Sequence, residues 1–145
     1  MKSEKITYLT NKALIYNSAT NKFLLLKRTN YDKRGISWDL PGGTIEPGEE
    51  SPDGILREIK EETDLQVNNP TIAEQYSHIF SNNEWIIYAL YFCNEYKGEI
   101  KLSNEHSEYK WISADELNNY ELFVTLDHIK DKIKSFLDKK LNTNK

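Results

Sequence analysis

The chain has 145 residues and a formal net charge of −4, with 38% apolar and 12% aromatic residues. This length fits one compact domain, and the apolar content is sufficient for a hydrophobic core, which excludes a wholly disordered chain. The acidic balance argues against a protein that binds nucleic acid polymers through a broad basic face. The longest apolar run has nine residues, Trp85 to Cys93, which is about half of a membrane span. We therefore expect one soluble, cytoplasmic domain over residues 1–145.

Two hairpins are predicted along the chain. Strand-like runs over residues 6–16 and 23–28 flank a polar turn and predict the first hairpin. Runs over residues 71–80 and 85–93 predict the second hairpin. The last of these runs is apolar on both faces, so we expect it to be a central strand. Its single cysteine, Cys93, cannot form an internal disulfide and is interpreted as a small core residue in a reducing compartment.

The C-terminal third predicts one strand and two helices. Tyr109 and Trp111 alternate with polar neighbours, as in a half-buried strand. Ser113 and Glu116 have the spacing of a capping box, which starts a short helix. An apolar stripe at helical spacing predicts a final helix that packs on the sheet. The stripe consists of Leu126, Ile129, Ile133, Phe136 and Leu137. Strands and helices interleaved in this way predict an α/β (α+β) fold with a mixed sheet and helices on its faces.

Negative charge is concentrated between Glu46 and Asp64, where two bases against eight acids give a net charge of −6. Ser51 is expected to cap a helix whose first residue is Pro52, where the missing N–H costs nothing. On a helical wheel of about 100° per residue, an apolar face lies beside an acidic one. The apolar face holds Ile55, Leu56 and Ile59, and the acidic face holds Gly54, Glu58, Glu61 and Glu62. Gly54 is expected to leave room for the three glutamates.

These neighbouring glutamates need an explanation. Glu58 is i,i+3 to Glu61 and i,i+4 to Glu62, which costs the bare helix roughly 0.5 to 1 kcal/mol in total. A hard divalent cation, Mg²⁺ or Mn²⁺, is the natural compensation, because it prefers carboxylate and carbonyl oxygens. The alternative is an ordinary solvated face in which Arg57 pairs with Asp53 and Glu61.

A longer motif contains this helix. Gly43, Glu49 and the run Arg-Glu-Ile-Lys-Glu-Glu-Thr-Asp-Leu over residues 57–65 resemble the Nudix box of MutT-like Nudix hydrolases. The box is a loop–helix–loop signature of 23 residues, here residues 43–65. One position departs from the family pattern, because Asp64 stands where the family usually has glycine. That position would end the helix in a left-handed conformation, which Asp tolerates better than most residues.

The resemblance implies both a fold and a chemistry. The fold is the Nudix fold, an α/β/α sandwich with a mixed sheet, and the reaction is Mg²⁺- or Mn²⁺-dependent hydrolysis of a nucleoside diphosphate linked to a further group X. The implied metal ligands are Glu58, Glu61, Glu62 and the backbone carbonyl of Gly43. Glu49 and Arg57 would form an ion pair that fixes the loop against the helix. The implied partner is a small-molecule nucleotide, with no nucleic acid polymer and no membrane; a homodimer and the number of metal ions stay open.

Other candidate site residues lie outside the box. We expect Glu58 to be the general base, with the other box glutamates, Glu105 and Glu108 as alternatives. Glu105 and Glu108 precede Trp111 in a region that resembles the place where many Nudix proteins supply an extra acidic ligand, and we assign both to substrate binding. Arg28 ends a strand and is expected to reach a phosphate. The aromatic candidates for base stacking, each with the core as the alternative, are Tyr31 in a predicted loop over residues 31–37, Trp38, Phe80 and Phe123. His78, His106 and His128 show no ligand spacing and are interpreted as structural.

Markers of substrate preference are missing. Family members for ADP-ribose tend to have a proline where this chain has Phe80, and those for diadenosine polyphosphates a tyrosine where it has residues 81–83. By elimination we expect a nucleoside triphosphate, with an unmodified or oxidised base, to be hydrolysed to the monophosphate and pyrophosphate. A nucleotide sugar or other NDP-X is the next choice. A non-catalytic sensor need not retain the acids, and an isoprenoid diphosphate isomerase would need an active-site cysteine, for which Cys93 is a poor candidate.

Overall fold

The computed structural model describes residues 7–29 and 36–143. The larger sheet contains β1 (Thr7–Asn17), β2 (Lys22–Arg28), β3 (Trp38–Asp39), β4 (Gly42–Thr44), β6 (Thr71–Ile79), β7 (Trp85–Cys93) and β9 (His106–Ile112). A small sheet pairs β5 (Gln66–Asn68) with β8 (Glu95–Lys97). The helices of the described ranges are α1 (Ser51–Thr63), the 3₁₀ helix η2 (Ala114–Asn119) and α2 (Val124–Thr143).

The strand order of the larger sheet is β3-β2-β1-β7-β6, with β4 paired to β1 and β9 paired to β2. Both predicted hairpins are confirmed, since β1 is antiparallel to β2 and β6 is antiparallel to β7. The pairing of β1 with β7 is parallel, so the sheet is mixed, as predicted. The predicted central strand is also confirmed, because β7 lies between β1 and β6.

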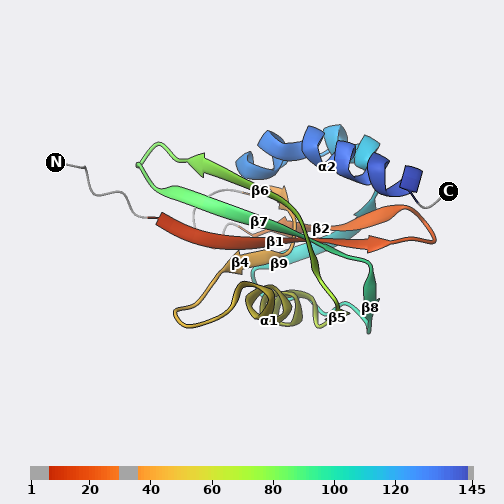
Figure 1. The fold of residues 1–145 in the computed structure, drawn as a ribbon, viewed down its shortest axis with the longest axis horizontal. Coiled ribbons are helices and arrows are strands. Elements are labelled where there is room, and N and C mark those ends of the chain that lie inside the picture. Colours follow the sequence, from red (N-terminus) through yellow and green to blue (C-terminus); the bar gives the residue numbers. More distant parts are fainter. Residues whose placement is uncertain (1–6, 30–35, 144–145) are drawn as a thin grey trace.

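The sheet lies between α2 on one face and α1 on the other, so the molecule is the predicted α/β/α sandwich (Figure 1). Successive residues of a strand point to opposite faces, and Ala13 and Leu14 of β1 accordingly enter different cores. The core beneath α2 includes Leu14, Phe23, Leu25, Tyr88, Leu90, Leu126, Ile129, Ile133 and Leu137. The core beneath α1 includes Ala13, Ile15, Leu24, Leu26, Ile55, Ile59, Ala89, Tyr91 and Cys93. The two cores explain why β7 is apolar on both faces.

The final helix has the predicted apolar stripe. Four of its members are buried, and Phe136 is partly buried against the same core. The lysines that follow Lys130 along α2 are mostly exposed. Within residues 7–29 and 36–143, no helix combines the length and the apolar content that a membrane crossing requires.

The helix ends confirm two sequence predictions and correct a third. The Glu116 carboxylate accepts hydrogen bonds from the backbone N–H and the hydroxyl of Ser113, both at 3.1 Å, at the start of η2. Asp64 ends α1 with φ 62°, the left-handed conformation expected there. Ser51 does not cap α1: the helix begins at Ser51, its N-cap is Glu50, and the Ser51 hydroxyl donates to Asn11 Oδ1 at 3.0 Å. A tertiary partner on β1 therefore replaces the local backbone partner.

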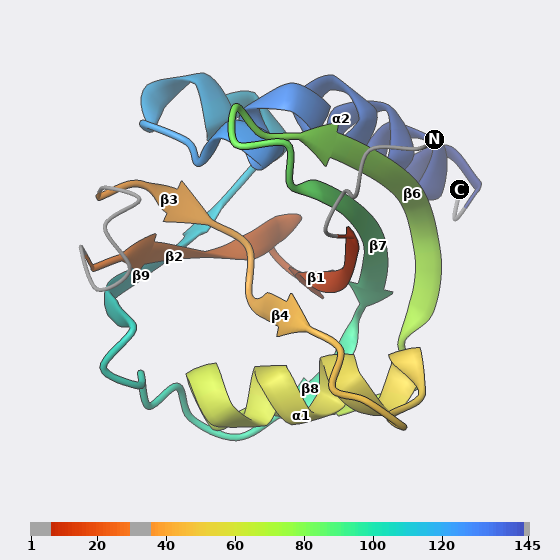
Figure 2. The ribbon, with the colours of Figure 1, turned by 90° about the vertical axis from the view of Figure 1, so that its left-hand side faces the viewer.

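Strand β4 places Gly42 and Gly43 next to α1. It pairs with β1 in the register Lys12↔Gly42 and Asn11↔Gly43, and it lies between β1 and α1 (Figure 2). Gly42 has φ +151°, and a Cβ built on it would lie 2.0 Å from the backbone oxygen of Asn11. No residue with a side chain fits this position, so the glycine is required by the close approach of two backbones.

The fold predicts an inert thiol. Cys93 is fully buried, and burial raises its pKa to about 12. Because the thiolate is the reactive form, the native protein at about pH 8 should not react with a thiol-specific disulfide reagent within minutes, whereas the denatured chain should release one equivalent of chromophore. Rapid reaction of native protein would show that β7 is not in the core.

Candidate active site

Glu62, in the last turn of α1, is a buried carboxylate next to Gly42 of β4. Its side chain is 4% exposed, and the Gly42 N–H donates to Oε1 at 2.8 Å. Burial raises the pKa of Glu62 to about 8, although the Lys12 cation and the Gly42 hydrogen bond act in the opposite direction. A carboxylate held in this way is stabilised by a cation placed against it.

Glu58 lies one turn earlier and faces the next glycine. A Cβ built on Gly43 would be 2.4 Å from the carboxyl carbon of Glu58, so this carboxylate lies directly over the Gly43 backbone. Burial raises the pKa of Glu58, and the nearby Arg57 guanidinium opposes the shift. The carboxylates of Glu62 and Glu58 therefore lie against the backbone of two successive glycines, Gly42 and Gly43.

Arg57 connects the loop to the helix. Its Nε and Nη2 donate to the two carboxylate oxygens of Glu49 at 2.7 and 3.0 Å, a bidentate pair, and its Nη1 reaches Glu58 Oε1 at 3.1 Å. The hydrogen bonds from Arg57 lower the pKa of Glu49 to about 2. The sequence assigned the space at Gly54 to the metal-binding glutamates, but the structure corrects this: a Cβ on Gly54 would lie 2.9 Å from Glu49 Oε1.

Glu61, the remaining acid of the helical wheel, is more exposed than the other two and shares Arg57 Nη1 with Glu58. Its side chain is 58% exposed and receives Arg57 Nη1 at 3.2 Å. Of Glu58, Glu61 and Glu62, only Glu62 lines the adjacent cavity. The structure thus brings Glu58 and Glu62 against the glycines, and Arg57 connects the exposed Glu61 to Glu58.

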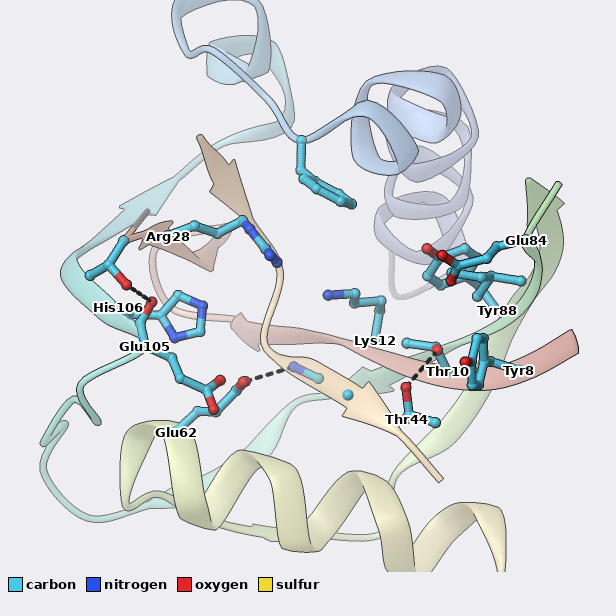
Figure 3. Close-up of a pocket in the computed structure, with 15 residues that line it drawn as sticks. Tyr8, Thr10, Lys12, Arg28, Thr44, Glu62, Glu84, Tyr88, Glu105 and His106 are labelled. Atoms are coloured by element: carbon cyan, nitrogen blue, oxygen red, sulfur yellow. Dashed lines mark hydrogen bonds between the residues drawn. The ribbon is translucent and has the colours of Figure 1, made fainter. Parts of the chain in front are cut away.

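A cavity of about 340 Å³ opens beside Glu62 and carries opposite charges on its two sides. Glu62 and Glu105 lie toward α1, and Lys12 and Arg28 extend from β1 and β2 above β4 (Figure 3). Lys12 Nζ donates to Asp39 Oδ2 at 2.8 Å, and Arg28 Nη1 lies 3.8 Å from the same oxygen.

The two cations share a single buried carboxylate. Burial alone would lower the pKa of Lys12, but Asp39 outweighs it and raises this pKa. The Arg28 guanidinium also lies 4.5 Å from the ring centroid of Phe123. Two cations beside one carboxylate suit this side of the cavity to an anionic ligand group.

A second cavity of about 330 Å³ is lined by Phe80, Ser81, Asn82, Glu84, Phe123 and Val124. It shares Glu84 and Phe123 with the first cavity, so the two are neighbours. Of the aromatic residues proposed to stack a base, Phe80 and Phe123 line this cavity. Trp38 instead packs edge-on against Tyr120 at 5.3 Å and lines neither cavity, and Tyr31 lies outside the described residues.

The two acids proposed near β9 have different surroundings. Glu105 lines the first cavity. Glu108 is 53% exposed, receives Lys27 Nζ at 3.1 Å and lines neither cavity. The register between β2 and β9 shifts after Lys27, which pairs with Glu108, so that Arg28 pairs with His106 and Ser107 is left without a partner in the register. This pairing brings the start of β9 to the cavity.

Sequence reasoning did not assign three charged or imidazole side chains of the first cavity to the site: Lys12, Glu84 and His106. Lys12 directly precedes the apolar run Ala13-Leu14-Ile15 of β1, and a lysine at the start of such a run was a usable signal for a partner such as Asp39. Glu84 follows a turn and carried no signal. His106 was interpreted as structural, yet it lines the cavity and is 8% exposed; burial and the Lys12 charge lower its pKa to about 4, so its imidazole is neutral at physiological pH.

On this α/β/α sandwich the buried Glu62 and the partly buried Glu58 lie against two glycines, and Lys12 and Arg28 lie on the opposite side of the cavity. The family model described as NUDIX domain matches residues 10–133. The chain therefore belongs to the Nudix family of pyrophosphohydrolases.

Named relatives act on different nucleotides. The chain is 36% identical over 101 residues to the pig bis(5'-nucleosyl)-tetraphosphatase [asymmetrical], a match that covers 66% of each chain. It is 29% identical over 115 residues to the nucleoside triphosphatase NudI of Escherichia coli, covering 70% of this chain and 80% of NudI.

Solved structures resemble it over more of its length. A MutT protein from Methanosarcina mazei Go1 superimposes with a TM-score of 0.79 and 31% identity, covering 99% of both chains. A Caenorhabditis elegans Ap4A hydrolase binary complex gives a TM-score of 0.68 and 25% identity, covering 90% of this chain and 98% of that one.

The Glu49–Arg57 pair predicts a pH-dependent contribution to stability. The folded pKa of Glu49, about 2, lies below the unfolded value of about 4.3. Its contribution is therefore fully present above the unfolded pKa and is lost as the pH falls through about 2. Glu49→Gln should lower the free energy of unfolding at neutral pH, and the gap from the wild type should close between roughly pH 4 and pH 2. Urea denaturation across this range measures the gap; Glu50→Gln, next to it and exposed, is the control and should change little.

The Glu58–Gly43 contact predicts a steric effect on catalysis. Gly43→Ala places a methyl group 2.4 Å from the carboxyl carbon of Glu58, so the carboxylate must move away to reach ordinary contact distance. Because a misplacement of about 1 Å can lower a catalytic rate about 100-fold, we expect a loss of about that size. The rate on the best nucleotide substrate and the thermal midpoint are measured together. Gly48→Ala is the control, because Gly48 has φ +83° with no atom within 4 Å: it should lose stability and keep its rate. Equal rates for the two variants would contradict the importance of the contact.

Proposed function

We propose that the chain catalyses the Mg²⁺- or Mn²⁺-dependent hydrolysis of a nucleoside triphosphate, with an unmodified or oxidised base, to the monophosphate and pyrophosphate. The observation that carries the proposal is the first cavity, in which the buried Glu62 and the exposed Glu105, which suit a cation, face two basic side chains that suit a phosphate chain. A phosphate chain that bridges the two sides would satisfy both at once.

The residues present fit a divalent cation. Glu62 is a nearly buried carboxylate with a raised pKa, and Glu58 lies against the Gly43 backbone, where a side chain would displace it. We propose that Glu58, Glu61, Glu62 and the Gly43 carbonyl hold the ion. Such an ion neutralises phosphate oxygens, stabilises charge on the leaving phosphate and makes a nearby water more acidic.

The chain's own side chains have distinct tasks in this proposal. Glu58 takes the proton of the attacking water, a task favoured by the burial that raises its pKa. Arg57 positions Glu58 and Glu49 through its hydrogen bonds. Lys12 and Arg28 bind phosphate oxygens. The oxygen of water bonds to phosphorus, the P–O–P bridge breaks, and the bridging oxygen leaves with pyrophosphate.

The second cavity supports a nucleotide over a smaller phosphorylated ligand. Phe80 and Phe123 supply apolar ring surface next to the phosphate side of the first cavity, and Glu84 lies between the two cavities as a hydrogen-bond acceptor. Nucleobases stack on such rings. We place the nucleoside there and the phosphates at Lys12 and Arg28.

A dinucleoside tetraphosphate is the second candidate substrate. It is favoured by the similarity to the pig tetraphosphatase, although no tyrosine marker is present at residues 81–83. Two neighbouring cavities leave room for a ligand longer than a triphosphate. Its asymmetric hydrolysis yields a nucleoside triphosphate and a monophosphate, products that differ from those of the first candidate.

The substrate is tested by product analysis. Purified protein is incubated with nucleoside triphosphates, dinucleoside tetraphosphates and nucleotide sugars, with Mg²⁺ or Mn²⁺, in ¹⁸O-labelled water. Formation of a nucleoside monophosphate and pyrophosphate, with a single ¹⁸O atom incorporated into one of the two products, supports the proposal. A triphosphate and a monophosphate from the tetraphosphate would favour the second candidate, whereas nucleoside diphosphate and orthophosphate would contradict both.

Glu62→Gln tests the site. The substitution keeps the shape of the side chain and removes its charge, so we expect kcat to fall by several orders of magnitude with little change in the circular dichroism spectrum. Glu99→Gln, in an exposed loop, is the matched control and should retain wild-type turnover. Near-normal turnover by Glu62→Gln would refute the proposed site.

A further inference from the structure

A second set of potential ligands lies on the side of the first cavity between α1 and β9. Glu62 of α1 and the neighbours Glu105 and His106 each offer one ligand atom, and these three atoms lie within 4.8 Å of one another. Figure 3 places the imidazole of His106 beside the carboxylates of Glu62 and Glu105, and all three residues line the cavity. A single ion at their centre would therefore be open to a ligand in the cavity.

His106 is the feature that distinguishes this set from a plain acidic cluster. Its side chain is more than nine-tenths buried, with 8% exposed. The Nδ1 atom is inaccessible to solvent and has no hydrogen-bond partner within residues 7–29 and 36–143. Leaving a buried polar atom unpaired costs about 1–3 kcal/mol, so each such atom calls for a partner. An ion in the cavity is a partner that the geometry permits.

The two carboxylates have free coordination capacity. The Gly42 N–H occupies Oε1 of Glu62, and no other hydrogen bond to this carboxylate occurs in the described chain. The Glu105 side chain is exposed and makes neither a hydrogen bond nor an ion pair with the described residues. Its backbone is fixed, because its carbonyl accepts the Thr29 N–H at 3.0 Å and the Thr29 hydroxyl at 3.1 Å.

The nearby cations do not occupy the centre of the set. Lys12 Nζ is bound to Asp39 at 2.8 Å and to the Leu40 carbonyl at 3.4 Å, and Arg28 lies toward Asp39 and over the ring of Phe123. Both therefore form ion pairs with Asp39, a carboxylate outside the set, although the Lys12 charge also acts on Glu62. The acids at Glu62 and Glu105 keep a negative charge between them that a divalent ion can balance.

We propose that Glu62, Glu105 and His106 form a mixed oxygen and nitrogen site that binds a first-row transition ion of the Mn²⁺ class in preference to Mg²⁺. Imidazole suits transition ions, whereas Mg²⁺ prefers carboxylate, carbonyl and water oxygens. The proposal deepens the proposed function, because it shares Glu62 with the catalytic ion and assigns metal selectivity to a residue outside the Nudix box.

The direct test is spectroscopic and needs no substrate. One equivalent of Mn²⁺ is added to the full chain, and pulsed electron paramagnetic resonance is used to detect ¹⁴N coupled to the ion. Coupling of a directly bound imidazole nitrogen supports the proposal. A wild-type spectrum without nitrogen coupling overturns it, even if Mn²⁺ binds and nucleotides are hydrolysed.

A variant separates coordination from a structural role. His106→Asn should abolish the nitrogen coupling and weaken Mn²⁺ binding about tenfold or more, while Mg²⁺ affinity from calorimetry stays unchanged. His128→Asn, an exposed histidine on α2, is the control and should change neither. Equal losses for both ions would overturn the proposed selectivity. Should His106→Asn not fold, the wild-type spectrum still decides. Nitrogen coupling in a protein that hydrolyses no nucleotide would refute the proposed function and leave this inference intact.

Discussion

The site depends on the absence of two side chains. Strand β4 enters the space between β1 and α1 because Gly42 and Gly43 present only backbone to both neighbours. At Gly42 the obstacle to a side chain is the backbone of β1, and at Gly43 it is the carboxyl group of Glu58. The same two residues thus fix the distance between the sheet and α1 and leave room for the acids. A side chain at Gly42 would disturb the packing of β4 on β1, and a side chain at Gly43 would displace the Glu58 carboxylate.

The acidic and basic side chains at the site are not balanced one to one. Asp39 is opposed by Lys12 and Arg28, whereas Glu62 and Glu105 have no basic partner within hydrogen-bonding distance in the described residues. Burial makes the imbalance at Asp39 and at Glu62 more costly than it would be in water. One side of the cavity is therefore suited to anions and the other to cations. A phosphate chain bound to a divalent ion would complement both sides of the cavity.

Long-range pattern in the sequence predicted the layers of the fold well. Two hairpins, the central β7 and the stripe of α2 each extend over seven or more residues, long enough for periodicity to identify them. The strands β3, β4, β5 and β8 have only two or three residues, too few for a periodic signal. They are strands because of the neighbours they meet, and those neighbours are distant in the sequence.

The candidate site divides in the same way. The box helix and its acids could be predicted, since their spacing is local. The partners of Ser51, Gly54 and Lys12 could not, because each is chosen by contact between segments: Asn11 displaces the expected cap, Glu49 fills the space at Gly54, and Asp39 holds Lys12. His106 was missed because a lone histidine has no spacing to interpret.

The parallel pairing of β1 with β7 affects how the chain acquires its site. Residues 7–15 align with residues 85–93, so the ladder at the middle of the sheet joins segments separated by more than half of the chain. Contacts of such high sequence separation form late and slow the search for the native topology. Lys12 belongs to the first segment, and Glu105 is synthesised after the second. A nascent chain that has emerged only through α1 would carry Lys12, Arg28 and the acidic motif, but it would lack β7, which pairs with β1, and also Glu105 and His106. Ligand recognition would therefore begin only after these later segments have been made.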